Sequence, residues 1–216
     1  RPLTCNLPKP MVPILNVPFL EHMLSYLKTH GVTEVIMALA YLPDRIQEHF
    51  GDGSAWGISL TYVVEKTPLG TAGGVKNVAS HLDDDTFLVF NGDVFTSIDL
   101  TAMIASHRQR GAAASIALTS VPDPTRYGVV EMDSQQQVLR FTEKPAKDQV
   151  NSNLINAGIY VLEPDCLDLV PADSHYMFER GLFPQLLEKG HKVCGYASSG
   201  YWIDIGTAEH YLQLHH

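Results

Sequence analysis

The sequence predicts an α/β protein with an open, mostly parallel sheet that is flanked by helices and carries added mixed β-strands at one edge. Strand-like and helix-like segments alternate along the first part of the chain, as expected for parallel strands with helices on both faces. Further along, strand-like segments follow one another with few helices between them. The 216 residues, 45% of them apolar, suffice for one sizeable core. Together these observations favour a Rossmann-like sheet.

The helices are predicted from their start and stop signals. A segment that follows Asn16, has Pro18 in its first turn and ends at Gly31 is typical of a helix. Gly111 stops another helix, and Thr207 can cap the last one. We expect helices over Val17–His30, Pro43–Phe50, Gly73–His81, Leu100–Arg110, Phe178–Lys189 and Thr207–Leu214.

The strands are predicted from short segments rich in β-branched and apolar residues, bounded by turn residues. They are Glu34–Ala40, Ile58–Val64, Thr86–Phe90, Ala113–Thr119, Gly128–Met132, Val138–Glu143, Ile155–Leu162 and Lys192–Tyr196.

Composition excludes several classes of partner. The formal net charge of −9 argues against a nucleic acid held by general electrostatics, although a nucleotide could still be bound by a few local cations and a metal. No apolar run approaches the roughly 20 residues that span a bilayer, and no signal-peptide pattern is visible. Cys5, Cys166 and Cys194 are scattered and odd in number, which is typical of reduced thiols. We therefore expect a cytoplasmic protein without a nucleic-acid or membrane partner.

A carboxylate follows the predicted strand Thr86–Phe90. Asp93 comes after Asn91 and Gly92, and Gly92 permits a sharp turn and a close ligand. Ligands of open α/β sheets bind at the carboxyl ends of the strands, where a carboxylate can hold a hard cation such as Mg²⁺. The alternative is a plain turn.

A second acidic string, Asp83-Asp84-Asp85, is similar to the metal motif of glycosyltransferases. This string precedes the strand, which places it at the amino edge of the sheet. We favour a solvated turn, while a metal-dependent glycosyltransferase remains an alternative that would require these residues to bind the metal.

Three further segments carry candidate ligand-binding groups. The Gly-rich string Leu69–Gly74 permits close approach of an anionic or flat ligand, or is a flexible helix entry; the chain has no GxxxxGK[ST] phosphate loop. Lys9 and Lys144, each beside proline, could neutralise phosphates, or could be solvated surface lysines. Asp204 could supply a second metal carboxylate, beside Trp202, for which core packing is the alternative role.

Taken together, these strings resemble the sugar-1-phosphate nucleotidyltransferase family. Each motif alone is weak, but the family's order is kept along the whole chain. The matching strings are Arg1-Pro2-Leu3-Thr4, Pro8-Lys9-Pro10, Leu69-Gly70-Thr71-Ala72-Gly73, Asn91-Gly92-Asp93, Tyr127-Gly128-Val129, Glu143-Lys144-Pro145, Asn156-Ala157-Gly158-Ile159-Tyr160 and Trp202-Ile203-Asp204-Ile205-Gly206-Thr207.

The resemblance implies a role for each matching residue. Asp93 and Asp204 would hold Mg²⁺, Lys9 would meet the nucleotide phosphates, and Lys144 would meet the sugar phosphate. These four are the implied catalytic residues. The implied substrate-binding residues are Gly70 and Thr71 near the base, Asn91, then Gly128, Glu143 and Asn156 at the sugar, and Trp202, which would support the Asp204 loop.

The implied reaction joins a nucleoside triphosphate and a sugar 1-phosphate, forming a nucleotide sugar and pyrophosphate. Glu65, at a strand end, could accept hydrogen bonds from guanine, or could face solvent. Leu69–Gly74 and Asn156–Tyr160 look more like guanylyltransferases acting on mannose 1-phosphate than like thymidylyltransferases, so GTP and mannose 1-phosphate are expected. The alternatives are a glucose-1-phosphate thymidylyl- or uridylyltransferase, and a regulatory subunit that binds nucleotide sugars without turnover.

The resemblance also bears on the extent of the catalytic domain. The family opens with a strand and a Gly-Gly-x-Gly-Thr-Arg loop ahead of the Arg-Pro-Leu-Thr string. Residues 1–216 are therefore expected to form one nucleotidyltransferase catalytic domain without that strand and loop. A homo-oligomer is compatible with the resemblance.

Overall fold

The computed structural model describes residues 4–215, which divide into two compact units. The first unit contains residues 4–68, 92–95 and 203–215, and the second contains residues 69–91 and 96–202. Arg1, Pro2 and Leu3 of the Arg-Pro-Leu-Thr string lie outside the described residues. Among residues 4–215, none of the helices has the length and apolar character that crossing a membrane requires.

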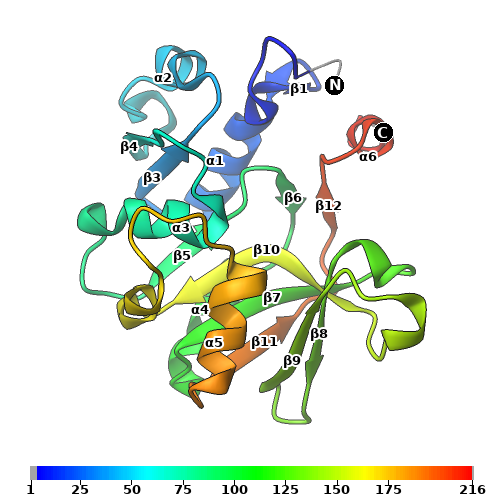
Figure 1. Ribbon diagram of the computed structural model, residues 1–216. Coiled ribbons are helices and arrows are strands. Elements are labelled where there is room, and N and C mark those ends of the chain that lie inside the picture. The colour runs from blue at the N-terminus through cyan, green and yellow to red at the C-terminus, as the bar shows by residue number, and fades with distance from the viewer. Residues whose placement is uncertain (1–3, 216) are drawn as a thin grey trace. The chain divides into compact units, whose positions relative to one another are not determined.

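The first unit contains a parallel β-α-β arrangement. Strand β3 (Glu34–Leu39) pairs in parallel with β4 (Ser59–Val64), and helix α2 (Pro43–Phe50) joins them. Ile46 and Phe50, one helical turn apart, form the buried side of α2. All three elements are confirmed within one residue of their predicted bounds (Figure 1).

The chain enters this unit through a 3-10 turn, η1 (Lys9–Met11), and a small hairpin of β1 (Pro13–Ile14) and β2 (Val17–Pro18). Helix α1 (Phe19–Thr29) follows, two residues later than predicted. Leu15 and Asn16 have φ of 49° and 66°, which is the backbone of a tight hairpin turn. Asn16 therefore turns the hairpin instead of capping the helix.

Two short strands pair near the chain's C-terminal part: β6 (Val94–Thr96) and β12 (Trp202–Asp204). Neither was predicted, because three residues are too few to show a strand pattern. Helix α6 (Ala208–Gln213) follows, and the Thr207 side chain accepts a hydrogen bond from His210 N at 3.1 Å. The predicted cap at Thr207 is confirmed.

The second unit is built on a six-stranded sheet in the order β11-β7-β10-β8-β9, with β5 also paired to β10. Strand β10 is antiparallel to β5, β7 and β8, whereas β11 is parallel to β7. The mixed strands expected in the later part of the chain are present, but they form the body of this sheet instead of one edge, and most of its pairings are antiparallel. The strands are β5 (Phe87–Phe90), β7 (Ala114–Ser120), β8 (Gly128–Met132), β9 (Val138–Glu143), β10 (Leu154–Leu162) and β11 (Val193–Ala197).

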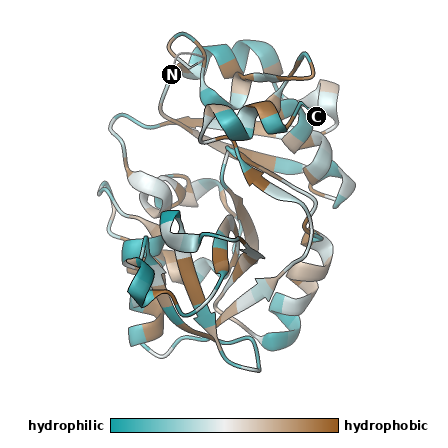
Figure 2. Cartoon of the chain, turned by 90° about the vertical axis from the view of Figure 1, so that its right-hand side faces the viewer, coloured by the Kyte–Doolittle hydropathy of each residue, from teal (hydrophilic) through white to brown (hydrophobic). Residues whose placement is uncertain are grey.

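Helices pack on both faces of this sheet because side chains of β7 alternate in direction. Ile116 joins the buried cluster that holds Phe183 of α5 (Phe183–Glu188), while the neighbouring Ser115 contacts His107 of α4 (Leu100–Arg110) at 2.8 Å. Figure 2 shows hydrophobic segments on the strands and hydrophilic ones on helices and connections. The α/β class is thus confirmed.

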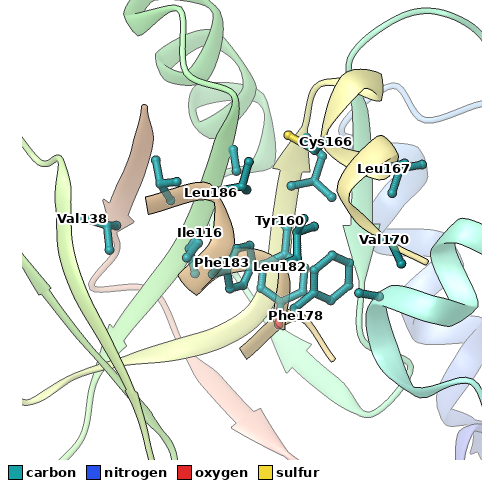
Figure 3. Close-up of a cluster of buried hydrophobic side chains, with 14 of the residues drawn as sticks. Ile116, Val138, Tyr160, Cys166, Leu167, Val170, Phe178, Leu182, Phe183 and Leu186 are labelled. Atoms are coloured by element: carbon teal, nitrogen blue, oxygen red, sulfur yellow. The ribbon is translucent and has the colours of Figure 1, made fainter. Parts of the chain in front are cut away.

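An aromatic group forms the centre of the second unit's core. The ring of Tyr160 lies 4.7 Å from that of Phe178 and 5.1 Å from that of Phe183, centroid to centroid (Figure 3). All three residues have no solvent-exposed surface. Because Tyr160 lies on the central strand β10, this core fixes the strand that carries the predicted site residue Asn156.

Two predicted helices differ in detail. Helix α3 (Gly70–Asn77) begins three residues earlier than expected, and a 3-10 turn, η3 (Ala79–His81), follows it. The stretch Phe178–Lys189 begins with a π-helical turn, η7 (Phe178–Leu182), before α5. Single π-helical turns are frequent at functional sites. The remaining 3-10 turns are η2 (Ser54–Trp56), η4 (Pro124–Arg126), η5 (Lys147–Gln149) and η6 (Pro164–Leu169).

Candidate functional site

Lys9 and Asp93, 84 positions apart, form an ion pair in the first unit. Lys9 Nζ lies 2.6 Å from Asp93 Oδ2, and the two side chains are 35% and 37% exposed. Pro8 and Pro10 flank Lys9 and hold its backbone at the start of η1. The structure thus brings together two of the four residues expected to be catalytic.

Asp204 lies in the same unit, beside the backbone of Asp93. The carbonyl oxygen of Asp93 accepts a hydrogen bond from Ile205 N at 2.9 Å. Asp204 Oδ1 accepts one from Gly206 N at 2.7 Å, and His210 Nδ1 lies 3.2 Å from the same oxygen. One carboxylate oxygen is therefore held by the protein, and no bond to Oδ2 is found among the described residues.

A pocket of about 520 Å³ opens next to Lys9. Its lining includes Pro10, the β3 residues Ala38 and Leu39, and Tyr41. Glu65, expected to read the base, extends the β3–β4 pair because its N–H donates to Leu39 O at 2.7 Å. The structure leaves the proposed role of its carboxylate as a prediction.

The Leu69–Gly74 string forms the entry to α3 in the second unit. Gly70 has φ of 74°, and a Cβ there would lie 2.7 Å from Tyr176 O. Thr71 Oγ1 accepts a hydrogen bond from Phe178 N at 3.1 Å. Glycine is required here because the backbone of residues 176–178 packs directly against this string.

Asn156 lies where β10 is interrupted by a bulge in its pairing with β7. Its Oδ1 accepts a hydrogen bond from Gly158 N at 2.9 Å, and its Nδ2 donates to Tyr160 Oη at 2.8 Å. Gly158 has φ of 75°, and a Cβ there would lie 2.7 Å from Asn91 Nδ2. The bulge therefore brings Asn91 and Asn156, both predicted site residues, around one glycine.

Gly128 and Glu143 are directly paired across β8 and β9. A Cβ on Gly128 would lie 2.5 Å from the Phe141 ring and 3.0 Å from Glu143 Oε2, so glycine makes room for both side chains. The next residue, Lys144, has φ of 48° and a side chain that is 60% exposed. Its Nζ lies 3.8 Å from Glu143 Oε1. A left-handed lysine backbone is uncommon and concentrates at binding sites.

Trp202 is anchored within the second unit. Its indole Nε1 donates to Ala157 O at 2.8 Å, and its ring meets that of Tyr127 edge-on at 5.7 Å. These contacts give Trp202 a packing role beside the β10 bulge, and its support of the Asp204 loop stays a prediction.

Glu179 and His210 were not singled out from the sequence. Glu179 lies near Thr71, Asn156 and Tyr160, with oxygen distances of 3.4 to 3.5 Å. Burial, and secondarily the charge of Glu143, raises the pKa of the Glu179 carboxyl. In the sequence, Glu179 is an acidic residue next to Phe178 at the start of a predicted helix. Acidic residues are common in the first turn of any helix, so this pattern did not indicate a functional residue.

The acidic string Asp83–Asp85 is exposed. Asp85 Oδ1 accepts a hydrogen bond from Thr86 N at 2.7 Å, as in an ordinary turn. Within residues 4–215, no group of three or more His, Cys, Asp or Glu residues could hold a metal ion. The exposure of Asp83–Asp85 and the Asp85–Thr86 bond are those of a solvated turn.

The chain belongs to the nucleotidyl transferase family, whose model it matches over residues 1–216. It is 42% identical to a mannose-1-phosphate guanylyltransferase of Mycobacterium tuberculosis, over 99% of this chain and 59% of that protein. It is 36% identical to a UTP–glucose-1-phosphate uridylyltransferase of Synechocystis sp., over 99% of this chain and 58% of that protein. The chain thus spans less than two thirds of the length of these relatives.

A solved structure with the same fold is HddC from Yersinia pseudotuberculosis complexed with GMP-PN. The TM-score is 0.84 at 29% identity, and the match covers 97% of this chain and 89% of that one. The predicted family and the Rossmann-like α/β fold are confirmed.

Proposed function

We propose that this chain transfers a nucleotidyl group from a nucleoside triphosphate to a sugar 1-phosphate, with GTP and mannose 1-phosphate as the preferred pair. The observation that carries the proposal is the Lys9–Asp93 pair, with Asp204 on the adjoining backbone segment. The names of the relatives support the reaction class. The guanylyl preference is supported by the 42% identical relative, while the uridylyltransferase relative favours the alternative pair.

The donor set around Asp93 and Asp204 fits Mg²⁺. Mg²⁺ prefers oxygen ligands and is usually held by one or two carboxylates together with substrate phosphates. Asp93 Oδ2 already faces a cation, the Lys9 ammonium, at 2.6 Å. Asp204 is held through its other oxygen by Gly206 N, which leaves Oδ2 available. When bound, Mg²⁺ would neutralise charge on the phosphates.

The chemistry needs positioning more than proton transfer. An oxygen of the sugar 1-phosphate attacks the α-phosphorus, a new P–O bond forms, and the bond to the β-phosphate oxygen breaks with release of pyrophosphate. The nucleophile is already an anion, so a general base is unnecessary. Lys9 would move its ammonium from Asp93 to the triphosphate, and the exposed Lys144 would hold the sugar phosphate.

The sugar is proposed to bind in the second unit. Glu143 can accept hydrogen bonds from sugar hydroxyls, and Gly128 leaves space beside it. The Gly70 backbone, which has no Cβ, would border the base, and Glu65 would accept from guanine. Glu143 and Gly128 would thus contact the sugar, and Gly70 and Glu65 the base.

The test is pyrophosphate release and nucleotide-sugar formation with GTP, UTP and dTTP, each with mannose or glucose 1-phosphate. We expect the highest kcat/KM with GTP and mannose 1-phosphate. Asp93→Asn and Asp204→Asn should each lower kcat at least about 100-fold, whereas Asp84→Asn, in the exposed acidic turn, should have little effect. Greater activity with UTP or dTTP would overturn the guanylyl preference.

A second series separates the enzyme from a regulatory subunit. The chain is compared with a version extended by the family's strand and Gly-Gly-x-Gly-Thr-Arg segment. An enzyme should gain turnover on extension. A regulatory subunit should bind the nucleotide sugar in both forms and release pyrophosphate in neither, which would contradict the proposal.

A further inference from the structure

Glu179 faces hydrogen-bond donors from two separate segments of the second unit. Thr71 Oγ1 lies 3.5 Å from Glu179 Oε2, while Asn156 Nδ2 and Tyr160 Oη each lie 3.4 Å from Oε1. We propose that Glu179 is a positioning residue that couples the Leu69–Gly74 loop to the Asn156 strand. This inference rests on the proposed function, which assigns the loop to the nucleotide and the strand to the sugar.

On the loop side, the backbone before Glu179 is bonded to the Gly-rich string. Tyr176 O accepts hydrogen bonds from Ala72 N and Gly73 N, both at 3.0 Å, and Tyr176 N donates to Leu69 O at 2.8 Å. Phe178 N donates to Thr71 Oγ1, and the Thr71 hydroxyl can donate to Glu179 Oε2 at 3.5 Å or to Met177 Sδ at 3.9 Å. The loop is therefore hydrogen-bonded to the segment that leads into the π-helical turn.

On the strand side, the Asn156 amide has a fixed orientation. Its oxygen accepts from Gly158 N at 2.9 Å, so its nitrogen must face Tyr160 and Glu179. If the carboxylate were lost, one amide hydrogen of Asn156 would lack its acceptor. The Asn156 side chain would then keep its bonds to Gly158 N and Tyr160 Oη but would lose its link to the Leu69–Gly74 loop.

An ionised carboxylate suits a site surrounded by donors, because it only accepts hydrogen bonds. The contacts are long for hydrogen bonds, and burial together with the charge of Glu143 disfavours the ionised form. The placement of donors from the loop and from the strand around this one carboxylate is what joins the two segments.

The first experiment compares Glu179→Gln with the wild-type chain and with Glu188→Gln, a matched change of an exposed glutamate on the adjoining helix. We expect an unchanged or higher unfolding midpoint for Glu179→Gln, with KM for the sugar 1-phosphate raised about tenfold and kcat changed less. Glu179→Asp should recover part of the loss. A fall in the unfolding midpoint with unaltered KM would show a structural role and overturn the inference.

The second experiment tests the coupling itself. Thr71→Val should weaken binding of the sugar 1-phosphate in the wild-type chain, although Thr71 belongs to the nucleotide loop. In the Glu179→Gln background the same change should have no further effect on that binding. Equal effects in both backgrounds would contradict the coupling.

A ligand-free measurement keeps this inference separate from the proposed function. In ¹H–¹⁵N spectra, Glu179→Gln should shift the side-chain amide signals of Asn156, and Thr71→Val should shift them less. The Asn151 amide, exposed on the surface, serves as the reference. Unmoved Asn156 signals would overturn the inference, whereas absent turnover with shifted signals would count against the proposed function alone.

Discussion

The ammonium of Lys9 and the carboxylate of Asp93 lie 2.6 Å apart, so a lysine occupies the place next to a carboxylate proposed to hold a metal. Mg²⁺ and Lys9 would compete for this carboxylate. The triphosphate offers Lys9 another partner, so binding of the nucleotide and of the metal should favour each other.

Replacing Lys9 by Met should therefore have opposite effects on the two ligands. We expect the affinity for Mn²⁺ without nucleotide to rise about fivefold, since exposed pairs contribute up to about 1 kcal/mol, while the affinity for nucleoside triphosphate falls. Titration calorimetry gives both constants. Lys28→Met, which removes an exposed lysine bonded to Trp56 O, is the control. An unchanged Mn²⁺ affinity in Lys9→Met would show that the pair does not compete with the metal.

His210 should act through Asp204. Its Nδ1 lies 3.0 Å from Asp204 O and 3.2 Å from Oδ1, so it orients the carboxylate. Partners of metal ligands commonly contribute a factor of ten or more to affinity, so His210→Ala should weaken Mn²⁺ binding about tenfold. His49→Ala, which removes a histidine paired with Glu21 in the same unit, should leave Mn²⁺ binding unchanged. Equal Mn²⁺ affinity in His210→Ala and wild type would exclude this role.

Replacing Gly158, in the β10 bulge, should destabilise the second unit more than replacing another glycine with the same φ. Gly158 and Gly190 both have φ of 75°. A Cβ on Gly158 would lie 2.7 Å from Asn91 Nδ2, whereas a Cβ on Gly190 would have no neighbouring atom of the described residues within 4 Å. Gly190→Ala should lower the free energy of unfolding by about 1 kcal/mol through backbone strain. Gly158→Ala should cost about 2 to 3 kcal/mol and weaken sugar-phosphate binding. Urea unfolding measures both, and equal losses would contradict the predicted clash.

Glu163 should make the stability of the second unit depend on pH. Burial acts to raise its pKa, but hydrogen bonds from Thr86 at 2.7 Å and from the buried His107 at 3.0 Å leave the pKa below its usual value. A carboxyl group whose pKa is lower in the folded than in the unfolded state stabilises the fold at pH values above its unfolded pKa. This stabilisation is lost as the pH falls through the folded pKa.

Glu163→Gln should therefore lower the free energy of unfolding at neutral pH by about 1 kcal/mol or less, because the side chain is 41% exposed and screened. The difference from wild type should shrink below about pH 4. Chemical unfolding at several pH values checks this. A difference that grows on acidification would have the wrong sign.

The sequence predicted most regular elements because their signals are local. Pro43 starts α2 and Gly111 ends α4, and both bounds are confirmed. The β1–β2 hairpin was missed because a Leu15-Asn16 turn with positive φ looks like a helix start. The strands β6 and β12 depend on pairing between distant segments, which no local pattern contains.

Site residues that belong to a sequence motif could be predicted, whereas contacts between distant residues could not. Asp93 follows a strand and could be placed at the edge of a sheet from the sequence. Its pairing with Lys9, and the approach of Glu179 to Asn156, join residues 84 and 23 positions apart. The π-helical turn that aims Glu179 has no signature distinct from that of an α-helix.

Strand β10 is both the middle of the second unit's sheet and the carrier of the Asn156 bulge. Its backbone amides can exchange with solvent water only when the unit opens as a whole, because β5, β7 and β8 all border it. The sugar recognition proposed at Asn156 should therefore have no separate melting step. Heating should abolish it together with the slowest-exchanging protons of the unit.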